Sequence, residues 1–284
     1  SKMTFADAEW DGSLANIKAC RHLTHLNLTA CGLGPKHAAD LADVFSPSGG
    51  CNIDTLCLAK NDALTGKRSR DNDNRAPWIY GEKTEGWVAL CSALPSTMIS
   101  LDFSGCALKP KSLTPLTDAI AKMPSLTSLC CGSNPGMVGE LQYGRLKTPD
   151  AHIDALQQLL DALKPSAVTD LDISGIGIGP TGADRVADYV RDAKASVASI
   201  SLSGNKITGT KRERREWKCD LDLSGIIAFG EAAAVSKTLA SIDLSDCGIS
   251  SKGIAEVARF MSAGSSIARI SVLSNPIGVE GATA

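Results

Sequence analysis

Residues 197–207 read VASISLSGNKI, in which apolar residues fill the first, fourth, sixth and eleventh places and asparagine fills the ninth. The apolar–x–apolar step at its centre is typical of a short strand, because successive side chains of a strand point to opposite faces. Asn205 follows where the chain leaves that strand, and an amide side chain there can bond to backbone groups of neighbouring turns. The stretch therefore predicts a short strand followed by an inward turn.

The same pattern recurs along nearly the whole chain, which identifies a repeat. Its eight copies begin at residues 23, 53, 98, 126, 168, 197, 239 and 267. We call the ninth place the ladder position, and its occupants are Cys31, Asn61, Cys106, Asn134, Ile176, Asn205, Cys247 and Asn275. Apolar residues at helical spacing between the copies predict helices over 36–46, 84–94, 110–122, 151–163, 180–194, 225–237 and 251–263.

The spacing of strands and helices predicts how these units stack. Neighbouring strands lie about 4.8 Å apart, whereas packed helices need about 8–10 Å. The helical side must therefore be the longer side. We predict an α/β fold, a right-handed solenoid shaped like a horseshoe, with parallel strands on the concave face and helices on the convex face.

The repeat resembles that of the leucine-rich repeat family, and a helix in every copy with short units near 28 residues resembles its ribonuclease-inhibitor-like subfamily. Ran GTPase-activating proteins and the repeat regions of intracellular innate-immune receptors are similar. The resemblance implies a binding scaffold, usually intracellular, that uses its concave face or a rim. It is specific for the fold and says little about the partner.

The repeat has a second, longer period. Successive copies start 30, 45, 28, 42, 29, 42 and 28 residues apart, so short and long units alternate. The extra length follows the ladder asparagine of copies two, four and six, in insertions over 65–83, 138–148 and 208–220. Because the insertions recur at the same point, we expect them to project from one rim, roughly 10 Å apart, and to touch one another.

The two ends of the chain differ in their predicted caps. Residues 1–22 are expected to carry an N-terminal capping helix over 4–20, and residues 23–284 to form the eight repeats. No C-terminal cap is expected after copy eight, although a solenoid needs a polar last layer. We therefore expect a fragment of a longer protein, or an end that a partner or another solenoid end covers.

Each insertion carries an aromatic residue and at least one arginine, the residue types that dominate binding hot spots. The candidate partner-binding residues are Trp78, Tyr80, Tyr143, Arg145, Arg214, Arg215 and Trp217. An alternative stays open, in which the aromatic side chains anchor their own loops. Acidic residues recur at one strand position of the concave face, and we add them to the candidate site: Asp102, Asp172 and Asp243.

Composition and motifs give no indication of catalysis. The chain of 284 residues has a formal net charge of −2 and four scattered histidines, without a nucleophile–base arrangement, zinc-type spacing or a complete phosphate or calcium loop. We therefore predict no catalytic, cofactor or metal site. Ten cysteines are too few for a disulfide scaffold, and no apolar run reaches the length of a spanning helix. We expect free thiols and a cytoplasmic protein, with the nucleus as the alternative.

The sequence favours a non-enzymatic scaffold for protein–protein interaction that uses the rim insertions and the concave face. Two alternatives are a GTPase-activating protein resembling the Ran activators and a nucleic-acid sensor that uses the basic run 211–215. Acidic residues alternate with that basic run, which makes nucleic acid the less favoured partner. We expect a protein partner, no membrane contact and no cofactor.

Overall fold

The computed structural model describes residues 7–20, 22–46, 51–68, 79–192, 197–213, 216–262 and 266–281. Eight strands form one sheet in the order β1-β2-β5-β6-β9-β10-β13-β14. Each strand pairs in parallel, and in register, with the strand of the next copy. The strands are β1 His25–Asn27, β2 Thr55–Cys57, β5 Ser100–Asp102, β6 Ser128–Cys130, β9 Asp170–Asp172, β10 Ser199–Ser201, β13 Ser241–Asp243 and β14 Arg269–Ser271.

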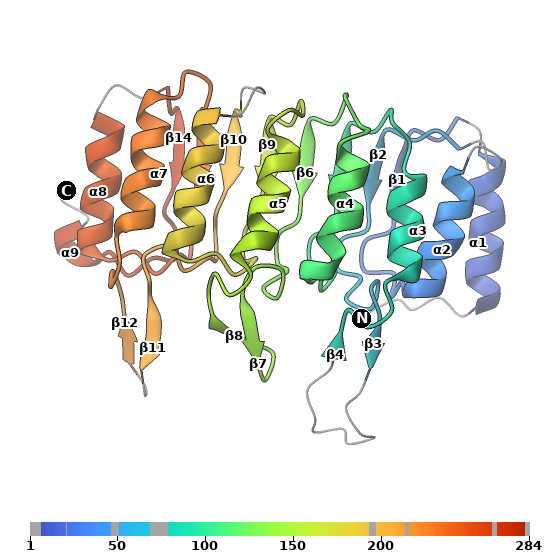
Figure 1. Cartoon of the computed structure of the whole chain (residues 1–284), viewed down its shortest axis with the longest axis horizontal. Helices are drawn as coiled ribbons and strands as arrows, with labels where there is room; N and C mark the ends of the chain where they lie inside the picture. Colours follow the sequence, from blue (N-terminus) through green and yellow to red (C-terminus); the bar gives the residue numbers. More distant parts are fainter. Residues whose placement is uncertain are drawn as a thin grey trace.

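The helices lie side by side over one face of the sheet (Figure 1). They are α1 Asp7–Ala19, α2 Pro35–Phe45, α3 Glu85–Ala93, α4 Leu113–Ile120, α5 Ile153–Leu163, α6 Pro180–Asp192, α7 Ser224–Val235, α8 Ser251–Ser262 and α9 Gly278–Gly281. Helices α2 to α8 connect consecutive strands of the sheet, whereas α1 precedes the first strand and α9 follows the last. The helix predicted over 110–122 is divided, since Pro110–Ser112 form a 3-10 turn before α4. The chain is an α/β solenoid, with strands on the concave face and helices on the convex face, as the repeat predicted.

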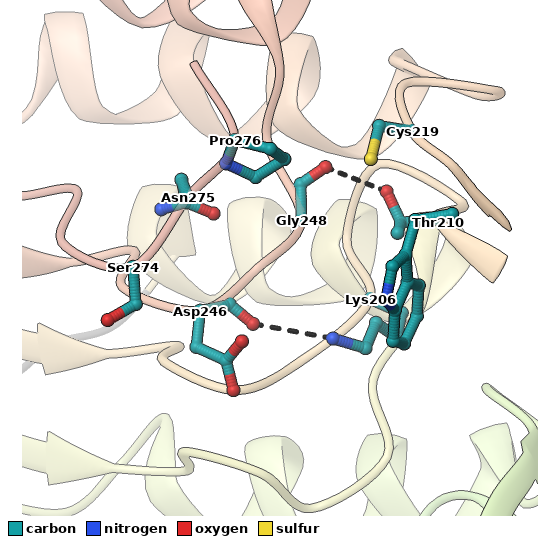
Figure 2. A pocket seen from close by; sticks show the side chains of 9 residues that line it. Lys206, Thr210, Cys219, Asp246, Gly248, Ser274, Asn275 and Pro276 are labelled. Atoms are coloured by element: carbon teal, nitrogen blue, oxygen red, sulfur yellow. Dashed lines mark hydrogen bonds between the residues drawn. The ribbon is translucent and has the colours of Figure 1, made fainter. Parts of the chain in front are cut away.

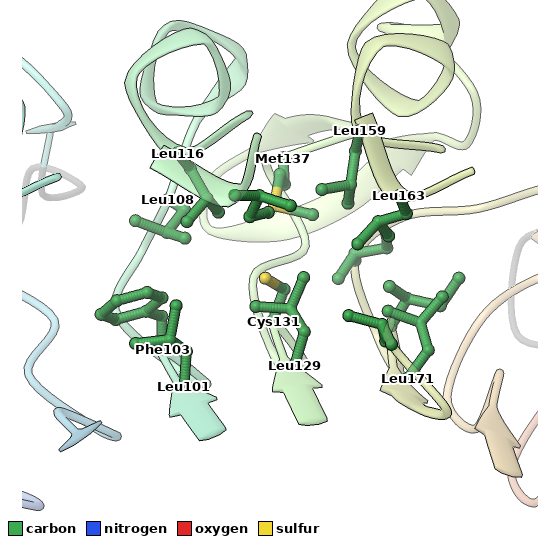
Figure 3. Packing of buried hydrophobic residues seen from close by; sticks show 14 of the residues in the cluster. Leu101, Phe103, Leu108, Leu116, Leu129, Cys131, Met137, Leu159, Leu163 and Leu171 are labelled. Atoms are coloured by element: carbon green, nitrogen blue, oxygen red, sulfur yellow. The ribbon is translucent and has the colours of Figure 1, made fainter. Parts of the chain in front are cut away.

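The core is a thin layer between the sheet and the helices. Figure 3 shows the middle of it, where strand residues such as Leu101 and Leu129 face helix residues such as Leu116 and Leu159. At the N-terminal end, Trp10 of α1 is fully buried and its indole Nε1 donates to Asp40 Oδ2 over 2.8 Å. No helix in the described part of the chain is both long enough and apolar enough to traverse a lipid bilayer.

The ladder asparagines bind backbone groups of the preceding copy. Each Oδ1 accepts an N–H over 3.0 Å, from Leu33, Leu108, Ile178 and Ile249 respectively. Each Nδ2 donates to a carbonyl of that same copy, from Leu28, Phe103, Ile173 and Leu244 respectively. One amide therefore satisfies both a donor and an acceptor that would otherwise be buried without partners.

Two cysteines at the ladder position, in odd copies, also bond the preceding copy. Cys106 Sγ donates to the Leu58 carbonyl over 3.1 Å, and Cys247 Sγ donates to the Leu202 carbonyl over 3.3 Å. Burial raises the pKa of each of these thiols to about 12, so they stay protonated and able to donate. All ten cysteines are unbridged.

The residue before each ladder position has a positive φ, in every one of the eight copies. The residues are Ala30, Lys60, Gly105, Ser133, Gly175, Gly204, Asp246 and Ser274, with φ between 52° and 72°. This left-handed step turns the chain inward after the strand and places the ladder side chain in the core. Five of the eight are not glycine, so the fold tolerates a conformation that costs L-residues about 1–2 kcal/mol.

Candidate functional site: the hairpin rim

The three insertions form β-hairpins that leave the same edge of the solenoid (Figure 1). Each is a two-stranded antiparallel sheet of its own. The pairs are β3 Lys67–Arg68 with β4 Ile79–Tyr80, β7 Glu140–Gln142 with β8 Arg145–Thr148, and β11 Lys211–Glu213 with β12 Glu216–Lys218. We call this edge the hairpin rim.

The expectation that neighbouring insertions touch one another is wrong for the described hairpin strands. Each of these strands pairs only with the other strand of its own hairpin, and Figure 1 shows the three hairpins standing apart along the rim. The expected 10 Å rests on strand spacing alone, whereas each hairpin lies in the chain between a strand of the sheet and the following helix. Helices of neighbouring copies are spaced about 8–10 Å apart, which is wider than the strand spacing. Neighbouring hairpins are two copies apart, so the distance between them exceeds the value given by strand spacing alone.

Two aspartates fix the hairpins to helices of the next copy: Asp150, two residues after the second insertion, and Asp220, the last residue of the third. Asp150 Oδ1 accepts the N–H of Gly179 over 2.7 Å, at the start of α6. Asp220 Oδ2 accepts the N–H of Gly253 over 2.8 Å and the hydroxyl of Ser250, at the start of α8. Both carboxylates therefore cap a helix that begins about thirty residues later in the chain. The sequence alone does not indicate these caps, because an N-cap residue normally directly precedes its helix.

The two capping aspartates stand in strained backbone, with φ of 58° for Asp150 and 53° for Asp220. Burial raises the pKa of the Asp150 carboxyl, and the N–H groups of Gly179, Gly182 and Thr181 oppose that rise. The hairpin bases are thus held by bonds to the body of the solenoid. These bonds make the bases a fixed platform for whatever the hairpins present.

Tyr143 lies at the tip of the second hairpin. It and Gly144 are the two loop residues between the paired Gln142 and Arg145, with φ of 53° and 74°. Positive φ at both places is the type I′ turn, which favours asparagine followed by glycine. The Tyr143 side chain is 80% exposed. A large aromatic residue therefore occupies a place that strains its backbone, and most of its surface remains in solvent.

Trp217 lies on the third hairpin and is 58% exposed. Its cross-strand partner is Arg212. The Lys206 ammonium lies 5.5 Å from the indole centroid, a distance typical of a cation–π contact. One face of the Trp217 ring therefore contacts the body of the solenoid. For that face, the contact favours the alternative in which an aromatic side chain anchors its own loop.

A pocket of about 410 Å³ lies beside Trp217 (Figure 2). Lys206, Thr210 and Cys219 line it together with the turns after strands β13 and β14, namely Asp246, Gly248, Ser274, Asn275 and Pro276. Lys206 Nζ donates to the Asp246 carbonyl over 3.4 Å, and Thr210 Oγ1 donates to the Gly248 carbonyl over 2.8 Å. The walls of this pocket come from copies six, seven and eight, so no pattern within one copy indicates it.

The other predicted rim residues are placed as follows. Tyr80 lies in β4, opposite Lys67, and Arg145 is exposed at the start of β8. Trp78, Arg214 and Arg215 lie outside the described residues. The structure thus gives side-chain surroundings for one aromatic residue of the second hairpin and one of the third.

The candidate aspartates on the sheet face are half-buried and already bonded within the sheet. Each Oδ1 accepts the N–H two residues on, over 2.9 Å, for the pairs Asp102–Ser104, Asp172–Ser174 and Asp243–Ser245. Thiols of the neighbouring strands donate to two of them: Cys57 to Asp102 over 3.2 Å and Cys130 to Asp172 over 3.0 Å. Much of the hydrogen-bonding capacity of these carboxylates is therefore used inside the fold. Within the described ranges, no three His, Cys, Asp or Glu side chains are placed to hold a metal ion.

A family-model match and one solved structure agree with this architecture. The family model described as Leucine Rich repeat matches residues 19–41 and 235–258. The crystal structure of the leucine-rich repeat-containing protein LegL7 from Legionella pneumophila superposes with a TM-score of 0.57 at 17% identity, covering 96% of this chain and 72% of that chain. A chain in the crystal structure of the Rad7 and Elc1 complex in yeast gives a TM-score of only 0.29 at 12% identity, with 90% and 73% coverage. No curated protein matches the sequence.

Proposed function

Because the chain is a leucine-rich repeat protein, we propose that it acts as a non-enzymatic scaffold and binds a protein partner through the hairpin rim. The concave face is the secondary contact. The LegL7 likeness concerns the fold alone, so the proposal stands on the rim of this chain.

The observation that carries the proposal is Tyr143. A type I′ turn forms best with asparagine at this place, so tyrosine weakens the hairpin. Its ring is 80% exposed, so it is not retained as an anchor for its own loop. A strained residue with an exposed aromatic ring supports an external role, and tyrosine and tryptophan are the residues that most often dominate binding energy.

The partner can be captured through Tyr143 itself. A photo-crosslinking phenylalanine analogue at position 143 is expected to trap the partner, and the same analogue at Val88 serves as the control. Val88 is also an exposed apolar residue, on the convex helix α3. Equal trapping of the same protein from both positions would contradict the rim as the site.

Binding of the captured partner then tests individual side chains. Tyr143→Ala combined with Trp217→Ala is expected to weaken binding by at least about 2 kcal/mol, the usual hot-spot threshold, and titration calorimetry measures this. The thermal midpoint should change little, because both rings are largely exposed.

The concave face is tested with the three aspartates changed to asparagine, which keeps each Oδ1 acceptor and removes the charge. This triple variant should matter less than the aromatic pair. Loss of binding in the triple variant, together with no effect of the aromatic pair, would place the partner on the concave face instead.

A further inference from the structure

We infer that the third hairpin binds an acidic segment of the protein partner, and that one apolar side chain of this segment enters the pocket beside Trp217. This inference rests on the proposed function and adds the chemistry of the partner at one hairpin. Three features of the molecule point to it: the charge of the insertions, the residues on one face of the third hairpin, and the lining of the pocket.

The insertions and the rest of the chain carry opposite net charges. The three insertions contain twelve lysines and arginines against seven aspartates and glutamates, a net charge of +5. The remaining residues contain 17 basic against 24 acidic side chains, a net charge of −7. Basic hairpins thus project from an acidic body, and this polarity steers acidic groups towards the rim.

On the third hairpin, the two faces differ in the cations that they offer. Lys211 and Lys218 lie opposite each other and pair with glutamates of their own strands, over 2.7 Å to Glu213 and 3.4 Å to Glu216. Arg212 lies opposite Trp217, is exposed, and forms no ion pair within the described residues. Directly opposite residues share a face of the ribbon. A carboxylate of the partner can therefore meet Arg212 beside the indole.

The pocket accounts for the apolar part of the segment. Its volume of about 410 Å³ is enough for a large side chain, and Trp217 and Pro276 belong to its lining. The exposed side chain of Asp246 also lines it. An acidic side chain inside the pocket would be repelled by Asp246, and Lys206, the one cation among the described lining residues, already contacts the Asp246 carbonyl and the Trp217 ring. A backbone N–H of the segment can donate to the Asp246 carboxylate. The apolar group therefore lies inside, and the acidic groups lie outside on Arg212.

The geometry favours a protein segment over a single-stranded nucleic acid. A strand-tracking site stacks successive bases on aromatic side chains placed along a basic groove. Tyr143 occupies the tip of its hairpin, whereas Trp217 lies within a strand beside the body. These two aromatic residues occupy non-equivalent places on their hairpins, so they do not form a regular row on which successive bases could stack. The acidic residues of the sheet face also repel a continuous chain of phosphates.

Short labelled peptides test this chemistry directly. The first is a fluorescein-labelled peptide of aspartate and glutamate with one central phenylalanine, and the second has serine in place of the phenylalanine. Oligothymidylate of similar charge is the third probe. The phenylalanine peptide should bind the full chain best, and its affinity should fall as salt is added. Trp217→Ala and Arg212→Glu should each weaken binding by about tenfold or more, which corresponds to about 1.4 kcal/mol.

Lys122→Glu is the matched charge reversal, since Lys122 is exposed just after the C-terminal end of α4, at the edge opposite the hairpins. It should leave peptide affinity unchanged, and circular dichroism checks that all variants are folded. The inference is overturned if neither peptide binds at millimolar concentration, if both bind equally, if oligothymidylate binds more tightly, or if Lys122→Glu weakens binding as much as Arg212→Glu.

Two further results separate this inference from the proposed function. If the partner trapped at position 143 binds Arg212→Glu and wild type equally, the rim stays the site and the acidic chemistry is wrong. If the chain self-associates in a salt-dependent way that Arg212→Glu abolishes, as sedimentation would show, the occupant is a second copy, and the inference of a separate acidic partner falls.

Discussion

At the scale of single residues, the ladder asparagines join each even copy to the odd copy before it. Asn134 is fully buried, and its amide bonds the N–H of Leu108 and the carbonyls of Phe103 and Cys131. The sequence analysis predicted this role from the type of residue and its place after the strand. Two of the three bonded groups, on Leu108 and Phe103, belong to the preceding copy, so the pattern within one copy could not identify them.

Asn134→Leu should therefore lower the free energy of unfolding by about 2–5 kcal/mol, since each buried group left without a partner costs about 1–3 kcal/mol. Urea denaturation measures the loss. Asn275→Leu is the internal control: the same bonds are made there, but Asn275 is only partly buried and water can replace its amide. Equal losses in the two variants, or none in the first, would refute the structural role of the buried amide.

The left-handed residue before each ladder position gives a second prediction at this scale. Ser133→Gly should raise the free energy of unfolding by up to about 1 kcal/mol, because glycine adopts positive φ without strain. Gly204→Ala should lower it by about 1 kcal/mol. A Cβ on Gly204 would meet no atom closer than 3.6 Å, so this variant reports on backbone conformation and not on crowding. Thermal unfolding of the pair gives both signs, and a rise for Gly204→Ala would contradict the argument.

At the scale of elements, the second and third hairpins are coupled to α6 and α8, helices of the next copy, through Asp150 and Asp220. Helix caps usually come from the adjoining residues, but here the cap follows a hairpin that belongs to the previous copy. Each of these insertions therefore also stabilises the start of a helix further along the solenoid. This explains why aspartates stand in left-handed backbone just after the second insertion, at Asp150, and at the end of the third, at Asp220.

Asp150 also makes stability depend on pH. Its pKa is raised above the ordinary value of 3.8, chiefly by burial. The folded chain then holds this proton at a pH where the unfolded chain has lost it, so the free energy of unfolding falls as pH rises from the ordinary pKa through the raised one. Asp150→Asn removes this titration and keeps an Oδ1 acceptor for Gly179. Its stability relative to wild type should therefore rise across that window, as urea titrations between about pH 4 and pH 7 would show.

Asp222 makes the free energy of unfolding depend on pH in the opposite direction to Asp150. The hydroxyl and the N–H of Ser224 lower the pKa of its carboxyl, so its contribution to stability is present above the ordinary pKa and is lost as pH falls through the lowered one. Asp222→Asn should lose stability relative to wild type as pH rises. If both variants show the same slope, the local causes assigned to the two carboxyls are wrong.

At the scale of the whole molecule, the solenoid separates stability from recognition. Each copy contributes a strand and a helix to one continuous core, so the body depends on contacts between neighbouring copies. The exposed strands of the second and third hairpins stand outside that core, whereas the bases of these hairpins are bonded to it through Asp150 and Asp220. Charge is divided in the same way, because the insertions are net basic and the rest of the chain is net acidic.

The sequence by itself determined the eight copies, the parallel strands, the helices between them and the places of the three insertions. These features follow from local periodicity, since a period of two residues or about 3.6 residues shows within each segment. The ladder and the exposed turn residue Tyr143 could likewise be recognised as candidates from residue type and position.

Only the tertiary structure decided which groups of different copies meet. Asp150 meets Gly179, Lys206 meets Asp246, and Trp217 and Pro276 line one pocket, although each pair is far apart in the chain. The separation of the hairpins likewise depends on how far apart the helices of neighbouring copies lie, and the strand spacing alone does not give it. Such contacts depend on how whole copies stack, and a pattern confined to one copy carries no information about the distance from one copy to the next.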